Sequence, residues 1–256
     1  MKYTLTLIAL IAVFFVKANP PKQEYYEIRI YQLSNQEQEK RLDAYLKDAL
    51  LPALHRAGNG KIGVFKPVGN DTAAIKKVYL LIAYKSLTEL DELDNKLTND
   101  KQYNTAGADY INAAHDNPAY TRFSKTILKA FSGHPALTLP KLTGARNERV
   151  YELRSYEGAT EKLYRKKVDM FVKGNEIAIF DNLKFNHIFY AEVLAGTAMP
   201  NLMYMTSFEN KKSRDEHWKA FGEHPDWKKL SSDKQYENTV SHIDMTFLYP
   251  TEYSDY

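Results

Sequence analysis

YEIRIY at Tyr26–Tyr31 and YELRSY at Tyr151–Tyr156 are two copies of one short pattern, 125 positions apart. Each copy is followed by a long helical pattern, two apolar runs, a second helical pattern and a last apolar run. A similar order of elements at a fixed spacing indicates an internal repeat. The sequence therefore predicts two units, over residues 24–131 and 148–250, joined by a linker at 132–147 that is rich in proline and glycine.

Hydrophobic periodicity predicts the elements of each unit. In the first unit we expect strands at Tyr25–Leu33, Lys61–Val68, Lys77–Tyr84 and Thr126–Phe131, and helices at Glu39–Arg56 and Leu87–Leu97. In the second we expect strands at Arg149–Tyr156, His187–Leu194, Leu202–Phe208 and His242–Tyr249, and helices at Glu161–Phe180, Lys211–Phe221 and Trp227–Ser231. Both units have the β-α-β-β-α-β order of a ferredoxin-like fold. Each sheet would have helices on one face only, so the two sheets can cover each other and close a barrel. The expected fold class is α+β.

The N-terminus has the pattern of a secretory signal. Lys2 precedes the short apolar run Leu5–Val16, and Val16-Lys17-Ala18 places small residues where a signal peptidase reads them. The run is shorter than the roughly 20 apolar residues of a membrane-spanning helix, which is the alternative. We expect residues 1–18 to be a signal peptide, and the protein to be secreted or periplasmic, with no membrane span after cleavage.

Charge and cysteine content exclude several classes of function. Cleavage after Ala18 would remove Lys2 and Lys17 from the 35 basic side chains and none of the 32 acidic ones, so the formal charge would fall from +3 to +1. Such a balanced surface does not attract nucleic acid over a long range. There is no cysteine, which rules out disulfides, a thiol nucleophile and thiolate metal ligands.

The second unit resembles the NIPSNAP family, within the dimeric α+β-barrel superfamily. The resemblance rests on the strand YELRSY, on the helix SRDEHWKAFGEHPDWKKL at Ser213–Leu230 and on the closing apolar strand. A fainter copy covers the first unit, which indicates an intramolecular version of the dimeric barrel. The resemblance implies the fold. It implies no single reaction, because the superfamily includes cofactor-free monooxygenases, small-molecule isomerases and haem enzymes, and a shared fold does not fix function.

Both first strands repeat a polar alternation, E-x-R-x-Y. Side chains two apart in a strand share a face, and these are Glu27, Arg29 and Tyr31 in one unit and Glu152, Arg154 and Tyr156 in the other. We expect the mainly apolar face to meet the helices, which would direct the polar face into the barrel. An arginine there could hold an anionic or carbonyl group, with tyrosine as donor. The alternative is an internal ion-pair network that fixes strand register.

The last strand differs between the two units. His242 and Asp244 share a face and form a His–carboxylate pair suited to proton transfer near neutral pH. If they face the barrel, they predict a catalytic group with Tyr156. His187 begins a neighbouring strand and would add a ligand contact; with His242 and Asp244 it is also the set that a metal would use, although we expect no metal and no cofactor.

The aromatic side chains of the last helices allow two interpretations. Trp218, Phe221 and Trp227 could form a wall against a ligand, or they could pack the helix onto its sheet. The sequence thus predicts a small organic molecule bound in the barrel by Glu27, Arg29, Tyr31, Glu152, Arg154, His187 and Trp218. A cofactor-independent monooxygenase or isomerase, and a structural or interaction module with a filled barrel, are the alternatives. A small organic ligand and a second copy in a homodimer are the partners expected.

Overall fold

The computed structural model describes residues 22–256, so the expected signal peptide lies outside the described residues. The first half contains β1 (Tyr25–Leu33), α1 (Gln36–Tyr45), a π-helical turn (Leu46–Leu50), α2 (Leu51–Arg56), β2 (Gly63–Pro67), β3 (Lys76–Tyr84), α3 (Leu87–Thr98), α4 (Lys101–Ala106), α5 (Ala108–Ile111) and β4 (Arg122–Ala130). The second contains β5 (Val150–Glu157), α6 (Glu161–Val172), α7 (Glu176–Asn182), β6 (Asn186–Ala195), β7 (Asn201–Phe208), α8 (Lys211–Glu223), α9 (Pro225–Ser231) and β8 (His242–Pro250). No helix among these residues is long and apolar enough to cross a membrane.

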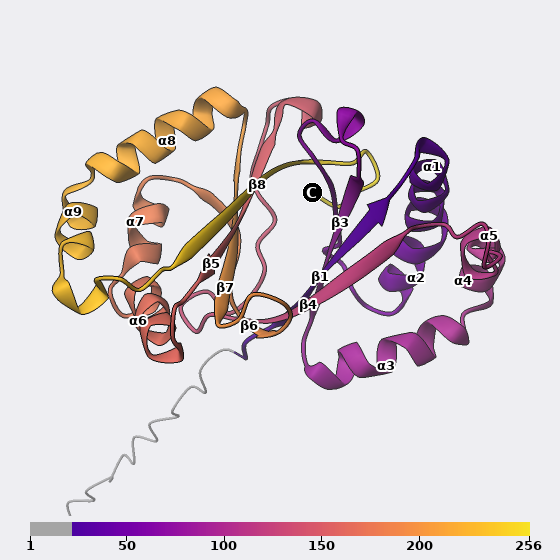
Figure 1. The fold of residues 1–256 in the computed structure, drawn as a ribbon, viewed down its shortest axis with the longest axis horizontal. Coiled ribbons are helices and arrows are strands. Elements are labelled where there is room, and N and C mark those ends of the chain that lie inside the picture. The colour runs from indigo at the N-terminus through magenta and orange to yellow at the C-terminus, as the bar shows by residue number, and fades with distance from the viewer. Residues whose placement is uncertain (1–21) are drawn as a thin grey trace, which may run out of the picture.

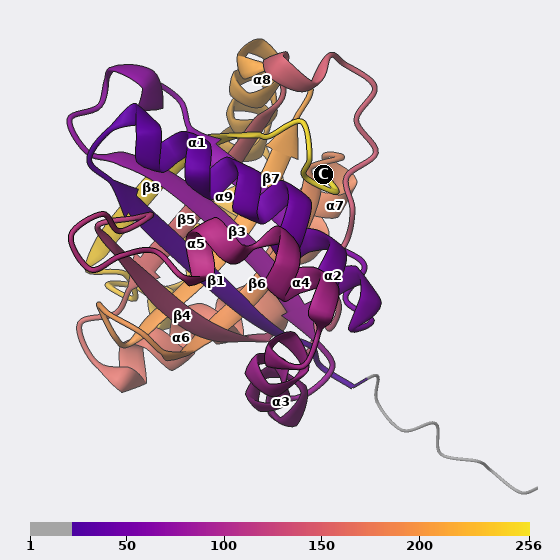
Figure 2. The same cartoon turned by 90° about the vertical axis from the view of Figure 1, so that its right-hand side faces the viewer.

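The eight strands form one closed antiparallel barrel in the order β1-β3-β2-β8-β5-β7-β6-β4. In each half the first strand lies between the third and the fourth, and the second strand pairs with the third. The halves join where β2 pairs with β8 and where β4 pairs with β6. Helices α1 to α5 lie outside one side of the barrel and α6 to α9 outside the other (Figures 1 and 2). The predicted barrel with external helices is therefore confirmed.

One predicted helix is wrong. The expected helix Glu161–Phe180 is two helices, because α6 ends at Val172 and α7 begins at Glu176. A side chain at Gly174 would place its Cβ 2.5 Å from the carbonyl oxygen of Met170, and Asn175 has a left-handed φ of 61°. A left-handed residue, usually glycine and sometimes asparagine, commonly ends a helix. The matching helix of the first half runs on without a break, through its π-helical turn.

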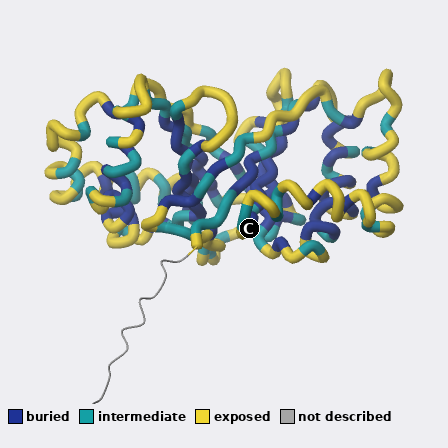
Figure 3. The backbone as a smooth tube through the Cα atoms, turned by 90° about the horizontal axis from the view of Figure 1, so that it is seen from below, coloured by how far each residue is buried: buried dark blue, intermediate teal, exposed yellow. Residues whose placement is uncertain are grey.

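The apolar core has three parts. The central part lies inside the barrel, and the other two lie between the strands and the helices of each half. Buried backbone accordingly runs through the strands and the inner sides of the helices, while the outer sides of the helices are exposed (Figure 3). The central part includes large aromatic side chains, namely Tyr26, Phe65, Tyr151, Phe189 and Tyr256.

The segment 251–256, which comes after β8 in the chain, runs alongside β2 and closes one end of the barrel. The amide of Thr251 donates to the carbonyl of Val64 over 2.9 Å. The ring of Tyr256 packs against those of Phe65 and Tyr151, with centroids 5.4 and 6.2 Å apart. Tyr151 is near the start of β5, so the opposite end of the barrel lies where β1 and β5 finish.

Candidate functional site

The open end of the barrel holds a cavity of about 340 Å³. It lies among the ends of β1 and β5 and the beginnings of β4, β7 and β8. Its polar lining includes Ser124, Thr126, Ser155, Asn201, Asp244 and Thr246, and its apolar lining includes Ile30, Leu153 and Met203. We call this cavity the barrel mouth. An eight-stranded barrel is just wide enough to be filled by side chains or to hold one small ligand, and here its closed end is filled whereas its mouth is hollow.

Tyr79 also lines the barrel mouth. Burial raises the pKa of its hydroxyl, and the nearby carboxylate of Asp244 raises that pKa further. The phenol therefore stays protonated at neutral pH and is able to donate a hydrogen bond. The mouth combines donors and acceptors on its rim with an apolar floor, which is the usual make-up of a small-molecule site.

Two larger hollows lie outside the barrel. One, of about 440 Å³, lies beside α1 and is lined by Arg41, Asp116 and Asn117 among others. Arg41 already donates to Asp109 over 2.8 Å and to the carbonyl of Asn117 over 3.1 Å, so its charge is satisfied within the chain. The other, of about 430 Å³, lies between α7 and α9. Neither hollow is lined by residues of the core inside the barrel.

The polar E-x-R-x-Y faces do not point into the barrel, and that prediction was wrong. The residues between them, such as Tyr26, Ile28 and Leu153, belong to the core inside the barrel. The polar residues lie on the opposite face. Tyr31 and Tyr156 belong to the core between strands and helices, and Glu152 accepts from Arg214 of α8. Most of the other partners are on the same strand. Both faces of a barrel strand are buried, so the more apolar face is free to be the inner one.

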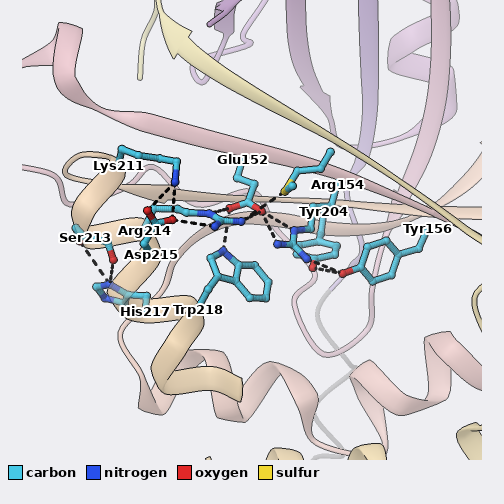
Figure 4. A network of polar contacts seen from close by, with 11 residues as sticks. Glu152, Arg154, Tyr156, Tyr204, Lys211, Ser213, Arg214, Asp215, His217 and Trp218 are labelled. Atoms are coloured by element: carbon cyan, nitrogen blue, oxygen red, sulfur yellow. Dashed lines mark hydrogen bonds and ion pairs between the residues drawn. The ribbon is translucent and has the colours of Figure 1, made fainter. Parts of the chain in front are cut away.

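Glu152 is the centre of the polar network in the second half (Figure 4). Its buried carboxylate accepts hydrogen bonds from Arg154 Nε over 2.6 Å, from Arg214 Nε over 2.7 Å and from Trp218 Nε1 over 2.8 Å. Burial alone would raise the pKa of Glu152, but Arg214 and Arg154 hold that pKa below its ordinary value. Glu152 therefore stays ionised and ties β5 to α8.

Arg154 extends this network along the strand. Its guanidinium lies 3.7 Å from the ring centroid of Trp218, and its Nη1 donates to the hydroxyl of Tyr156 over 3.0 Å. That hydroxyl is 2.8 Å from the hydroxyl of Tyr204. Trp218 also packs against Phe185, with centroids 5.2 Å apart. Trp218 therefore packs α8 onto the sheet, as the second interpretation of these aromatic residues predicts, because it contacts both β5 and the core.

The first half has a reduced version of the network. Arg29 Nε donates to Glu27 over 2.7 Å and Arg29 Nη1 to the hydroxyl of Tyr31 over 3.1 Å. Counted from the helix caps Ser86 and Asn210, the positions of Arg214 and Trp218 hold Leu90 and Asp94. The helix of the first half therefore offers neither the arginine nor the tryptophan that binds Glu152.

A buried ion pair in the second half was missed by the sequence analysis. Lys167 Nζ donates to Glu176 over 2.8 Å, and the two side chains are only 6% and 3% exposed. The ammonium also lies 4.7 Å from the ring centroid of Phe171. Burial raises the pKa of Glu176, and Lys167 partly offsets that effect. At the same distances from the caps Asn35 and Thr160, the first half holds the buried Leu42 and Leu51. A lysine on an otherwise apolar helix face was the available signal.

His187 lies on the helix side of β6, away from the barrel mouth. Its Nδ1 is 3.2 Å from a carboxylate oxygen of Asp181 in α7, and its ring packs edge-on against that of His134, with centroids 4.4 Å apart. Burial, followed by the neighbouring His187, lowers the pKa of His134 to about 4. Burial also lowers the pKa of His187, against the effect of Asp181. His187 therefore joins neither His242 nor the strand network.

The predicted catalytic residues are divided between two places. His242 Nε2 is 3.2 Å from Asp244 Oδ1, and both side chains are well exposed at the barrel mouth. Tyr156 lies on the opposite face of its strand, under the helices. The structure instead brings Glu157 next to the pair, since ligand atoms of Glu157, His242 and Asp244 all lie within 4.8 Å of one another. Alternation from Leu153 through Ser155 to Glu157 could have placed this carboxylate on the inner face.

The described residues thus form an α+β barrel of eight antiparallel strands, with their helices outside and a hollow at one end. The model of the NIPSNAP family matches residues 151–255, within the second half of the chain. No curated protein matches the chain.

Solved structures share the whole fold. A candidate monooxygenase from Fusobacterium nucleatum superposes with a TM-score of 0.55 at 8% identity, over 89% of this chain and 92% of that one. Another from Lactobacillus acidophilus gives 0.56 at 10% identity, over 89% and 94%. An anthrone oxidase-like protein gives 0.50 at 10% identity, over 90% and 92%. At such identities the likeness concerns the fold alone.

Proposed function

We propose that this protein binds a small organic molecule at the barrel mouth. The observation that carries the proposal is the cavity of about 340 Å³, which lies within the range of roughly 300–1,000 Å³ usual for ligand sites. The expected ligand has an apolar part for Ile30, Leu153 and Met203, and polar atoms for the hydroxyl and amide groups on the rim. The proposal moves the site from the polar strand faces, where the sequence located it, to the opposite faces of the same strands.

We also interpret the two halves as ferredoxin-like repeats within one intramolecular dimeric α+β barrel. The equal order of strands and helices in both halves supports this interpretation. Secretion or a periplasmic location is part of the proposal and rests on the pattern of residues 1–18. Sequencing the N-terminus of the protein isolated from its host would test it, because a chain that retains residues 1–18 contradicts cleavage.

Native mass spectrometry of protein purified from its own host tests the binding proposal. We expect a small mass that is lost on denaturation, and we expect Ser124→Trp to prevent its binding. Ser124 is exposed and lines the mouth, so a larger side chain there should fill the cavity without disturbing the core. Ser232→Trp, at an exposed residue after α9, is the matched control. A bare protein mass, or a ligand retained equally by both variants, would contradict the proposal.

The second candidate is a cofactor-independent monooxygenase or isomerase acting at the same mouth. It is favoured by the His242–Asp244 pair at 3.2 Å beside the cavity, in which His242 would be the base. The names of the similarly folded proteins agree with this candidate but do not establish it. Turnover of an identified substrate should fall by about 10²–10⁴ in His242→Ala, and unchanged turnover would eliminate the acid–base role.

The third candidate is an interaction module with a filled barrel. It is favoured by the aromatic packing at the closed end, where Tyr26, Phe65 and Tyr151 are fully buried in the core inside the barrel. This candidate predicts that Ser124→Trp changes neither a bound mass nor any activity. The same pair of tryptophan variants therefore separates it from the binding proposal.

A further inference from the structure

Three potential metal ligands meet on the rim of the barrel mouth. Glu157 ends β5, and His242 and Asp244 begin β8. Each offers one ligand atom, a carboxylate oxygen or an imidazole nitrogen, and these atoms all lie within 4.8 Å of one another. This is the one such group of three or more histidine, aspartate and glutamate side chains in residues 22–256.

Strand pairing explains why these side chains converge. Glu157 is the direct cross-strand partner of His242 in the antiparallel pair of β5 and β8, where opposite residues lie about 4.5–5.5 Å apart at Cβ. Asp244 is two residues further along β8, on the same face as His242. That face is the inner one, because Asp244 and Thr246 line the barrel mouth and Leu248 belongs to the core inside the barrel.

The spacing of the donors suits a divalent ion. Metal–nitrogen and metal–oxygen distances of about 2.0–2.2 Å put two ligands of one ion roughly 3–4 Å apart. His242 Nε2 and Asp244 Oδ1 are already 3.2 Å apart, and exposed side chains turn at little cost. Two carboxylates held together repel each other unless a cation lies between them.

We infer that Glu157, His242 and Asp244 bind one divalent transition-metal ion at the barrel mouth. One imidazole and two carboxylates are ligands that zinc, manganese and cobalt accept. Three protein ligands leave at least one coordination position open, and here it would face the cavity. The inference does not rest on the proposed function, since the ion would bind with or without an organic ligand. It competes with the acid–base candidate, because a lone pair of His242 that holds a metal cannot accept a proton.

Titration with Co²⁺ tests the site. Untagged protein is stripped with a chelator and titrated while the visible absorption of Co²⁺ is recorded, and equilibrium dialysis gives the stoichiometry. We expect one equivalent to bind, and we expect His242→Ala and Asp244→Asn each to weaken binding by at least about tenfold. Because both side chains are exposed, the variants should keep the wild-type circular dichroism spectrum and melting temperature.

His55→Ala is the matched control. His55 Nε2 lies 2.9 Å from Asp255 Oδ2, so this is an equally close histidine–carboxylate pair, but it lacks a third ligand. The control should bind Co²⁺ like the wild type. Failure of the wild type to bind Co²⁺ saturably, or binding that His242→Ala leaves unchanged, would overturn the inference without affecting the proposal of an organic ligand.

Discussion

Replacing the buried Lys167–Glu176 pair by two leucines should leave the protein folded, whereas either single replacement should destabilise it severely. The double variant Lys167→Leu/Glu176→Leu copies the first half, where Leu42 and Leu51 are buried at matching distances from the helix cap. The pair is 2.8 Å apart with side chains only 6% and 3% exposed. Neither charge can therefore return to water without local unfolding.

The magnitude follows from what each replacement leaves behind. Lys167→Leu leaves an unpaired buried carboxylate, and Glu176→Leu leaves an unpaired buried ammonium; each should cost about 3–5 kcal/mol of unfolding free energy. Replacing both partners by apolar groups is usually neutral or stabilising, by up to about 4 kcal/mol. As a control at the end of the same helix, Lys173→Leu removes an exposed partner of Asp169 and should leave the urea midpoint nearly unchanged.

Urea unfolding of the wild type, both single variants and the double variant measures these energies. The pKa of Glu176 is already raised by burial, and losing Lys167 should raise it further. A folded-state pKa above the unfolded value means that stability is gained as pH falls, so the cost of Lys167→Leu should shrink from pH 8 to pH 5. Additive losses in the double variant, or a cost of Lys167→Leu that does not change with pH, would refute this reasoning.

Three further predictions concern other buried groups and the site itself. The pKa of His134 is about 4 in the folded state against about 6.5 unfolded. The stability that its neutral form contributes is therefore complete above pH 6.5 and is lost as pH falls toward 4. Urea midpoints should show about 1–2 kcal/mol of this loss at pH 5, which His134→Gln should remove; an equal loss in that variant would contradict it. Glu152→Gln should cost more stability than Glu27→Gln, since Glu152 accepts from Arg154, Arg214 and Trp218 whereas Glu27 lacks a partner from α3; equal melting temperatures would be evidence against a special role of α8. Asn201→Ala should weaken ligand binding at the mouth, because Asn201 holds Ser155 in place through a 2.8 Å hydrogen bond. Calorimetry with an identified ligand measures the affinity, and an unchanged affinity would contradict this prediction.

The strand pattern of the sequence predicted the architecture closely. The strand Tyr25–Leu33 has the predicted bounds, and the other strands differ by at most a few residues at their ends. The spacing of 125 residues between the first strands is kept by the starts of α1 and α6. Alternation and helical periodicity are local properties, and these are what the fold reuses in each half.

The side of the sheet that forms the barrel interior could not be read from alternation. Alternation states which residues share a face, but in a closed barrel covered by helices both faces are buried. Tyr26 and Ile28 are as suitable for the interior as for a helix contact. In the second half Arg214 and Trp218 of α8 hold Glu152 on the outer face, but Glu27 lies on the same face without such partners.

The candidate site was predicted in part for the same reason. His242 and Asp244 do lie together at the barrel mouth, as the alternation of the last strand predicts. Tyr156, Arg154 and His187 lie elsewhere because their faces were assigned from the wrong side of the sheet. Glu157 and Ser155 were not predicted as site residues, since near the end of a strand too few residues follow for the alternation to show which face a side chain occupies.

Methyl NMR tests most directly whether ligand binds at the barrel mouth rather than between the strands and the helices. Of the six methionines, Met203 lines the mouth, whereas Met170 is a buried residue of α6, with its sulfur 3.3 Å from Lys167 Nζ. With ¹³C-labelled methionine methyl groups, small-molecule extract from the host is added to the protein. The account predicts that the Met203 resonance shifts while that of Met170 does not. A shift of Met170 without one of Met203 would contradict it.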